Sequence, residues 1–143
     1  MSSVSRLPHS RLGAPARTRL AGEVVAGYLS ARRELRRAPI EQVIARLRAD
    51  PALPPPRDTA EGLQEARRLG WVVARTLRLL PGDTRCLTRS LVLTRLLARR
   101  GIAARLVIGA RPAPDFLAHA WVECEGEPVL SAGDGSFSRL VEL

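Results

Sequence analysis

Two side chains of this sequence could act together in covalent chemistry, the thiol of Cys86 and the imidazole of His119. The pair Pro81-Gly82 should end one helix, and Asp83 should cap the next, which puts Cys86 at the third helical position. Free main-chain N–H groups and the positive end of the helix dipole face such a residue and stabilise a thiolate. Cys86 could therefore be a nucleophile, although a lone cysteine can equally be a small buried apolar residue.

His119 belongs to an expected strand over residues 117–124, in which side chains alternate between two faces. Its ring shares a face with Trp121 and Glu123, and the opposite face carries Ala118, Ala120, Val122 and Cys124. If this strand packs against the helix that carries the thiol, the imidazole can take the thiol proton and later return a proton to a leaving amine. The alternative is a packed or exposed histidine that takes no part in chemistry.

A catalytic imidazole needs a third group that orients it and stabilises its charged form. Asp134 is the first candidate, because a hairpin could bring it alongside His119; the alternative is a turn residue within Gly-Asp-Gly. Glu123 lies four residues along the same strand as His119, roughly 13 Å away, which is too far for a direct contact. Ser131 is a weaker option.

The elements that must position these groups are helices followed by short strands. Hydrophobic periodicity predicts a helix over residues 16–37, a second opening at Pro39, and a third running from an Asp58 cap to Leu80. A fourth, central helix is expected over residues 84–100, closed by Gly101 at its C′ position. Strands are expected at residues 103–110, 117–124, 129–131 and 137–141, with a turn over residues 125–128.

This order predicts an α+β fold in which a small antiparallel sheet packs on the central helix. We expect one compact domain with a disordered lead-in over residues 1–15, a helical part over residues 16–80 and a catalytic core over residues 81–143. Cys124 is expected in the core, and His9, in the lead-in, is given no role.

The composition of the chain excludes several classes of protein. The chain has 143 residues and a formal net charge of +9, and its basic residues are all arginine. Two cysteines make neither a disulfide framework nor a zinc motif, and no phosphate-binding loop is present, so no metal or cofactor is expected. The arginines are scattered along helices and aromatic residues are few, which favours a solvated surface or an acidic partner over nucleic acid. No apolar run has the length of a membrane span or signal peptide, which predicts a cytoplasmic protein without a membrane partner.

Three ordered blocks resemble a known family: Cys86 to Gly101, Leu106 to Arg111, and Ala118 to Glu123. They resemble the lasso-peptide leader peptidases, which are stand-alone split B proteins of the transglutaminase-like cysteine peptidase superfamily. The resemblance covers about residues 68–131. It implies a transglutaminase-like or papain-like core that hydrolyses the leader–core junction of a ribosomal precursor peptide.

The resemblance also implies roles for individual residues and partners. Cys86 is the nucleophile and His119 the general base, while the family's aspartate shortly after the histidine has no counterpart in residues 129–131. Either Asp134 takes that part after a small insertion, or the triad is reduced to a dyad. The implied partners are the precursor's leader peptide, a separate leader-recognition protein and a macrolactam cyclase. Two alternatives stay open: a catalytically degenerate scaffold that couples these partners, and an acyl transferase that uses the same pair.

Overall fold

The fold is built around helix α4 (Cys86–Arg99), which is apolar over much of its circumference. The computed structural model describes residues 13–56, 60–80, 86–112, 114–131, 133 and 135–143. Leu91, Leu93 and Leu97 of α4 are fully buried. The helix is closed by Gly101, which has a φ of 68°, while the next residue returns a main-chain hydrogen bond to Leu97. This confirms the expected central helix and its glycine C′ residue.

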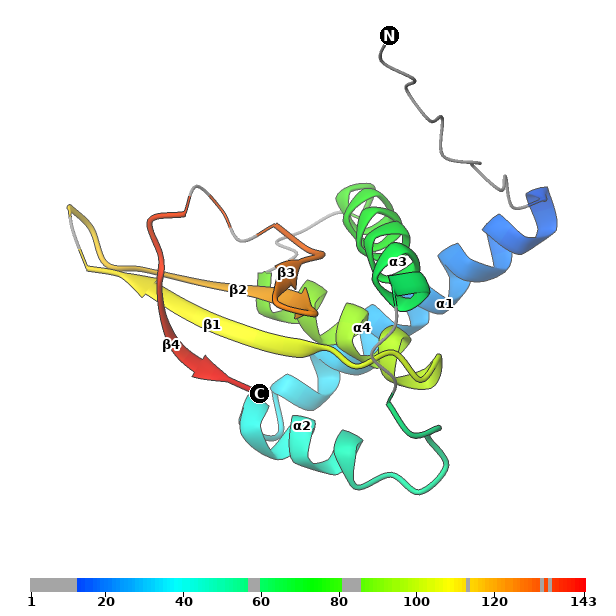
Figure 1. The fold of residues 1–143 in the computed structure, drawn as a ribbon, viewed down its shortest axis with the longest axis horizontal. Helices are drawn as coiled ribbons and strands as arrows, with labels where there is room; N and C mark the ends of the chain where they lie inside the picture. The colour runs from blue at the N-terminus through cyan, green and yellow to red at the C-terminus, as the bar shows by residue number, and fades with distance from the viewer. Residues whose placement is uncertain (1–12, 57–59, 81–85, 113, 132, 134) are drawn as a thin grey trace, which may run out of the picture.

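Three further helices precede α4, namely α1 (Ala14–Leu35), α2 (Ile40–Arg48) and α3 (Ala60–Arg78). Helices α1 and α3 both pack against α4, and α2 packs against α1 (Figure 1). An ion pair between Arg95 and Glu34 joins α4 to α1. Partial burial acts to raise the pKa of Glu34, but the hydrogen bond and charge of Arg95 outweigh it and lower that pKa. None of the helices in the described ranges combines the length and apolar character that crossing a bilayer requires.

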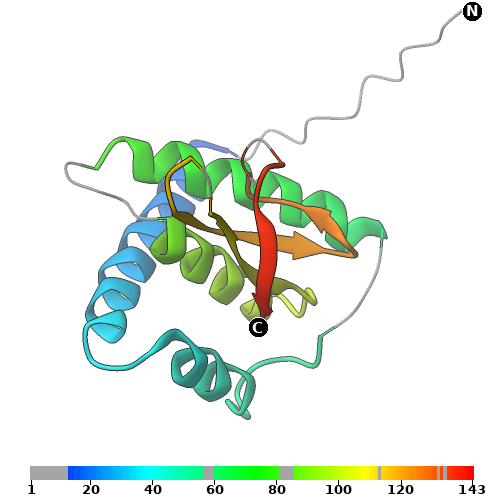
Figure 2. The same ribbon diagram turned by 90° about the vertical axis from the view of Figure 1, so that its left-hand side faces the viewer.

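The second half of the chain forms a four-stranded antiparallel sheet in the order β3-β2-β1-β4. Its strands are β1 (Arg105–Arg111), β2 (Leu117–Cys124), β3 (Glu127–Pro128) and β4 (Ser138–Glu142). One face carries Leu106, Val122 and Cys124 into the same core as the leucines of α4. The sheet and α4 lie against each other in two perpendicular views (Figures 1 and 2). The α+β fold class with a central helix on a small antiparallel sheet is therefore confirmed.

The strand expected at residues 129–131 is wrong, because β3 ends at Pro128. The N–H groups of Val129 and Leu130 both donate to the carbonyl of Val122, at 2.9 and 3.4 Å, so the regular ladder stops there. The turn before β3 is also shorter than expected. Glu125 and Gly126 both have positive φ angles, 54° and 77°, as a two-residue hairpin turn requires.

Other boundaries differ by a few residues. Helix α1 begins at Ala14, inside the expected lead-in, and Pro39 is the N-cap of α2 rather than its first residue. The expected caps Asp58 and Asp83 lie outside the described residues.

Helix α3 reaches the segment after β3 at a glycine. A Cβ atom built on Gly70 would lie 1.9 Å from the carbonyl oxygen of Val129 and 3.5 Å from a methyl group of Leu93. An ion pair between Arg67 and Glu127 also joins α3 to β3. The missing side chain at residue 70 therefore allows the helix to touch the main chain just after Pro128.

We predict opposite effects of two glycine-to-alanine substitutions in helices. Gly70→Ala should lower the free energy of unfolding by about 1–3 kcal/mol, because the new methyl group meets main-chain atoms that cannot move aside. Gly22→Ala, where nothing lies within 4 Å of the new Cβ, should raise it by about 0.5–1 kcal/mol. Urea unfolding followed by circular dichroism measures both. Equal effects of the two substitutions would contradict the close approach at Gly70.

Candidate active site

Cys86 is the first residue of α4 that the structure describes, and its side chain is partly buried. The main-chain N–H of Ala120, in β2, donates to its Sγ atom with a nitrogen–sulfur distance of 3.4 Å. Strand β3 pairs with β2 only at Glu123 and Cys124, so at Ala120 the start of the helix takes the place of a neighbouring strand. An N–H aimed at sulfur stabilises the thiolate more than the thiol. Helix α4 and strand β2 therefore meet at the sulfur, which accepts a main-chain hydrogen bond there.

This contact brings the sulfur to the part of β2 that carries His119. Because Ala120 follows His119 directly, Sγ lies no more than about 6 Å from the Cα of His119. The two residues come from different elements and are 33 positions apart in the sequence. Within the described residues the hydrogen bond of the imidazole goes to Ser131 and not to Cys86. Catalytic hydrogen bonds are often long or poorly aligned in enzymes without substrate.

The proton on the imidazole of His119 is located by its hydrogen bond. Nε2 lies 2.7 Å from the main-chain oxygen of Ser131, and a carbonyl oxygen can only accept. Nε2 therefore donates, and in the neutral ring Nδ1 keeps the lone pair. The ring holds the tautomer in which Nδ1 is the atom available as a base.

Two aromatic side chains contact the ring of His119. The indole of Trp121 stacks on it, with centroids 5.9 Å apart and planes at 22°. Phe137 contacts it at 5.2 Å and 36°. Gly133, with a φ of 80°, lies so close that an added Cβ would be 2.9 Å from the Phe137 ring and 3.7 Å from Cδ2 of His119. These contacts limit the rotation of the imidazole ring.

A glycine in β1 makes room for this aromatic group. Gly109 pairs directly with His119 in the sheet, and an added Cβ would lie 2.8 Å from the indole of Trp121. A glycine inside a buried strand often marks such a close approach. Strand alternation placed Trp121 on the face of His119, and Gly109 was a further signal of a close approach there, whereas the contact with Phe137 was not expected from the sequence.

The candidates for a third catalytic group lie in different places. Asp134 is outside the described residues. The Oγ of Ser131 accepts from the N–H of Gly133 at 3.2 Å, so it is the main chain of Ser131 that contacts the imidazole. Glu123 is buried and accepts from the indole of Trp121, and within the described part of the chain it makes no hydrogen bond to His119.

The carboxylate of Glu123 is paired with Arg139 by two hydrogen bonds, of 2.6 and 2.9 Å. Arg139 also bonds to the exposed Glu142, at 2.8 Å. The hydrogen bond to Glu142 and, to a smaller extent, the hydrogen bonds to Glu123 raise the pKa of the Arg139 guanidinium. The hydrogen bond from Arg139 lowers the pKa of Glu142.

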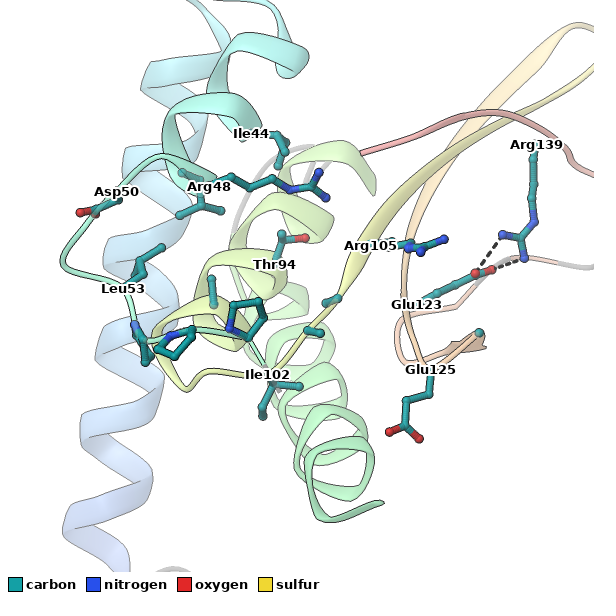
Figure 3. A pocket seen from close by; sticks show the side chains of 18 residues that line it. Ile44, Arg48, Asp50, Leu53, Thr94, Ile102, Arg105, Glu123, Glu125 and Arg139 are labelled. Carbon is teal, nitrogen blue, oxygen red and sulfur yellow. Dashed lines mark hydrogen bonds and ion pairs between the residues drawn. The ribbon is translucent and has the colours of Figure 1, made fainter. Parts of the chain in front are cut away.

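A recess of about 830 Å³ lies at the other end of α4, between α2, the proline-rich segment and the start of β1 (Figure 3). Its lining includes Thr94 and Ile102 but neither Cys86 nor His119. Cys86 and Cys124 are not joined in a disulfide, and Cys124 is buried and donates to the carbonyl of Ala103. In the described ranges no three histidine, cysteine or acidic side chains gather as metal ligands. The described site thus consists of Cys86, His119 and the groups around the imidazole.

Comparison with known proteins bears on this site. Neither the curated proteins nor the solved structures gave a match. A family model described as the transglutaminase-like superfamily matches residues 25–142, which reach from the middle of α1 to the end of β4 and include both Cys86 and His119. The chain belongs to the transglutaminase-like superfamily.

Proposed function

We propose that this protein is a cysteine peptidase in which Cys86 is the nucleophile and His119 the general base. The superfamily includes both cysteine peptidases and acyltransferases. The observation that carries the proposal is the hydrogen bond from Ala120 to the sulfur, because it brings the start of α4 against the residue next to His119. The donor role of Nε2 supports it further, since it leaves Nδ1 free to take a proton.

The reaction follows from these atoms. The thiol proton of Cys86 passes to Nδ1 of His119, and the sulfur adds to the carbonyl carbon of the scissile peptide bond. The main-chain N–H of Cys86, at the start of the helix, can donate to the oxyanion. The imidazolium then protonates the leaving amine, the C–N bond breaks and a thioester forms. Water, deprotonated by His119, attacks the thioester, and the sulfur leaves and regains its proton.

We propose a ribosomal lasso-peptide precursor as substrate, cleaved between leader and core in the cytoplasm. The three sequence blocks from Cys86 to Glu123 support this substrate, as they resemble the leader peptidases of that pathway. The same resemblance suggests a separate recognition protein that presents the leader and a macrolactam cyclase that uses the product. A purified mixture of precursor, recognition protein and this chain, analysed by mass spectrometry, tests the substrate. Fragments ending in a free carboxylate support hydrolysis, whereas an acyl group joined to an amine would indicate a transferase.

Four arginines at the end of α1 offer a surface for an acidic partner. Arg32, Arg33, Arg36 and Arg37 are exposed and border a shallow recess with Leu29, which is 60% exposed. A cationic surface with an apolar side chain at its margin fits an acidic segment that carries apolar residues. We propose that the recognition protein docks here.

The first prediction concerns the nucleophile and the base. Cys86→Ala should abolish cleavage, and His119→Ala should lower its rate by about 10²–10⁴-fold, because proton transfer is lost. The matched controls are Cys124→Ala and His9→Ala, which should retain cleavage. Cleavage by Cys86→Ala protein, or mature peptide formed in its presence, would overturn the peptidase and favour a scaffold.

The second prediction concerns Asp134, which we propose as the third catalytic group. Asp134→Asn should lower the cleavage rate at least about tenfold, because the negative charge of a third catalytic group stabilises the imidazolium. Ser131→Ala keeps the main-chain carbonyl that contacts His119 and should leave the rate within about twofold. An unchanged rate with Asp134→Asn would contradict the triad and leave that carbonyl as the partner of the imidazole.

The third prediction concerns the arginine surface. Arg36→Glu should slow cleavage of the presented precursor several-fold at low ionic strength, and salt should remove the difference by screening. Arg19→Glu makes the same charge change on an exposed residue near the other end of α1 and serves as control. Equal rates for both variants at every salt concentration would contradict docking at this surface. A loss that also occurs with free precursor and no recognition protein would assign the surface to the leader instead.

A further inference from the structure

A buried carboxylate lies on the same face of the sheet as the imidazole. The side chain of Glu123 is 8% exposed, and its Oε1 accepts from the indole N–H of Trp121 at 2.9 Å. The guanidinium of Arg139 bonds to both carboxylate oxygens (Figure 3). Both oxygens therefore have donors, and the indole is held by its nitrogen from one side.

The ring of this indole also contacts His119. Trp121 is 4% exposed and stacks on the imidazole. It also lies over Gly109, where no side chain separates it from the strand. An indole has one hydrogen-bond donor, and here Glu123 takes it, so the rotation of the ring that touches His119 depends on where this carboxylate is fixed. The chain of contacts runs from Arg139 through Glu123 and Trp121 to the imidazole.

The burial of the Glu123 carboxylate requires a physical explanation. Burying a carboxylate is unfavourable unless it is paired, and an apolar residue of similar size commonly serves as well for stability. The ion pair supplies a hydrogen-bond acceptor at a fixed point, which an apolar residue cannot do. This acceptor defines one orientation of Trp121. Direct action on His119 is excluded by the spacing along the strand, roughly 13 Å for four residues.

We propose that Glu123 is a positioning residue for His119, which it acts on through Trp121. The inference deepens the proposed function, because an imidazole serves as a base only when its plane is set toward the sulfur. Glu123 holds the indole nitrogen, the indole fixes one face of the imidazole, and Arg139 fixes Glu123. The role is distinct from that of a third catalytic group, since Glu123 does not touch the imidazole.

The test uses the ring protons of His119, because a stacked indole shifts their NMR resonances. His9→Gln leaves His119 as the only histidine of the full-length chain. In that background Trp121→Phe should move both ring resonances. Glu123→Leu should move them in the same direction, and combining it with Trp121→Phe should add little. Glu142→Gln changes the other acid bonded to Arg139 and should leave them in place.

Two further measurements keep the proposal falsifiable. If Glu123→Leu does not fold, Arg139→Gln removes the ion pair from a half-exposed position and should give a smaller shift in the same direction. With the precursor as substrate, Glu123→Gln should lower kcat about five- to tenfold with KM unchanged, while Glu142→Gln retains wild-type kcat. A folded Glu123→Leu protein with wild-type His119 resonances would overturn the positioning role.

The NMR experiment needs no substrate, so the two proposals fail separately. Shifted resonances in a protein that cleaves no precursor would retain the role of Glu123 and reject the peptidase. Cleavage of the precursor, together with His119 resonances that do not shift in the variants, would retain the peptidase and reject the role of Glu123.

Discussion

The contact between the start of α4 and the open edge of β2 is the interaction on which the site depends. There the N–H of Ala120 donates to the sulfur of Cys86 instead of to a neighbouring strand. Strand β3 is only two residues long and pairs further along β2, which leaves this edge free for the helix. If β3 continued in the same register for three residues past Pro128, Ser131 would lie opposite Ala120 and the ladder would compete for the same edge. The shortness of β3 and the contact between Ala120 and Cys86 therefore depend on each other.

The sulfur and the imidazole are held by different parts of the chain. Cys86 is fixed by a helix packed into the core, whereas the ring of His119 depends on main-chain and aromatic groups that follow β3. That later segment is in turn held by α3, which touches the carbonyl of Val129 through Gly70. Helix α3, which carries neither Cys86 nor His119, therefore contacts the main chain two residues before Ser131, whose carbonyl accepts from the imidazole.

The sequence predicted the elements that depend on local pattern. The eight residues of β2 and the end of α4 at Gly101 agree with the structure, because strand alternation and a left-handed glycine are local properties. The alternation also put Trp121 and Glu123 on the face of His119. What local pattern could not predict is the choice of Val122 as a shared acceptor for two N–H groups, which ends the ladder after Pro128. That choice depends on the approach of α3, a tertiary contact.

The same reasoning explains what was missed at the site. A search for a third group by residue type considers side chains such as Asp134, but the observed partner of Nε2 is a main-chain oxygen, which every residue possesses. Likewise, the distance along the strand correctly excludes direct contact between Glu123 and His119, yet a large aromatic residue between them carries the influence of one to the other. Two residues on one face of a strand can therefore be coupled when an aromatic side chain with a single polar atom lies between them. In Trp121 only the indole nitrogen can bind the carboxylate, while the ring stacks on the imidazole. The position of Glu123 therefore sets the orientation of the ring that contacts His119.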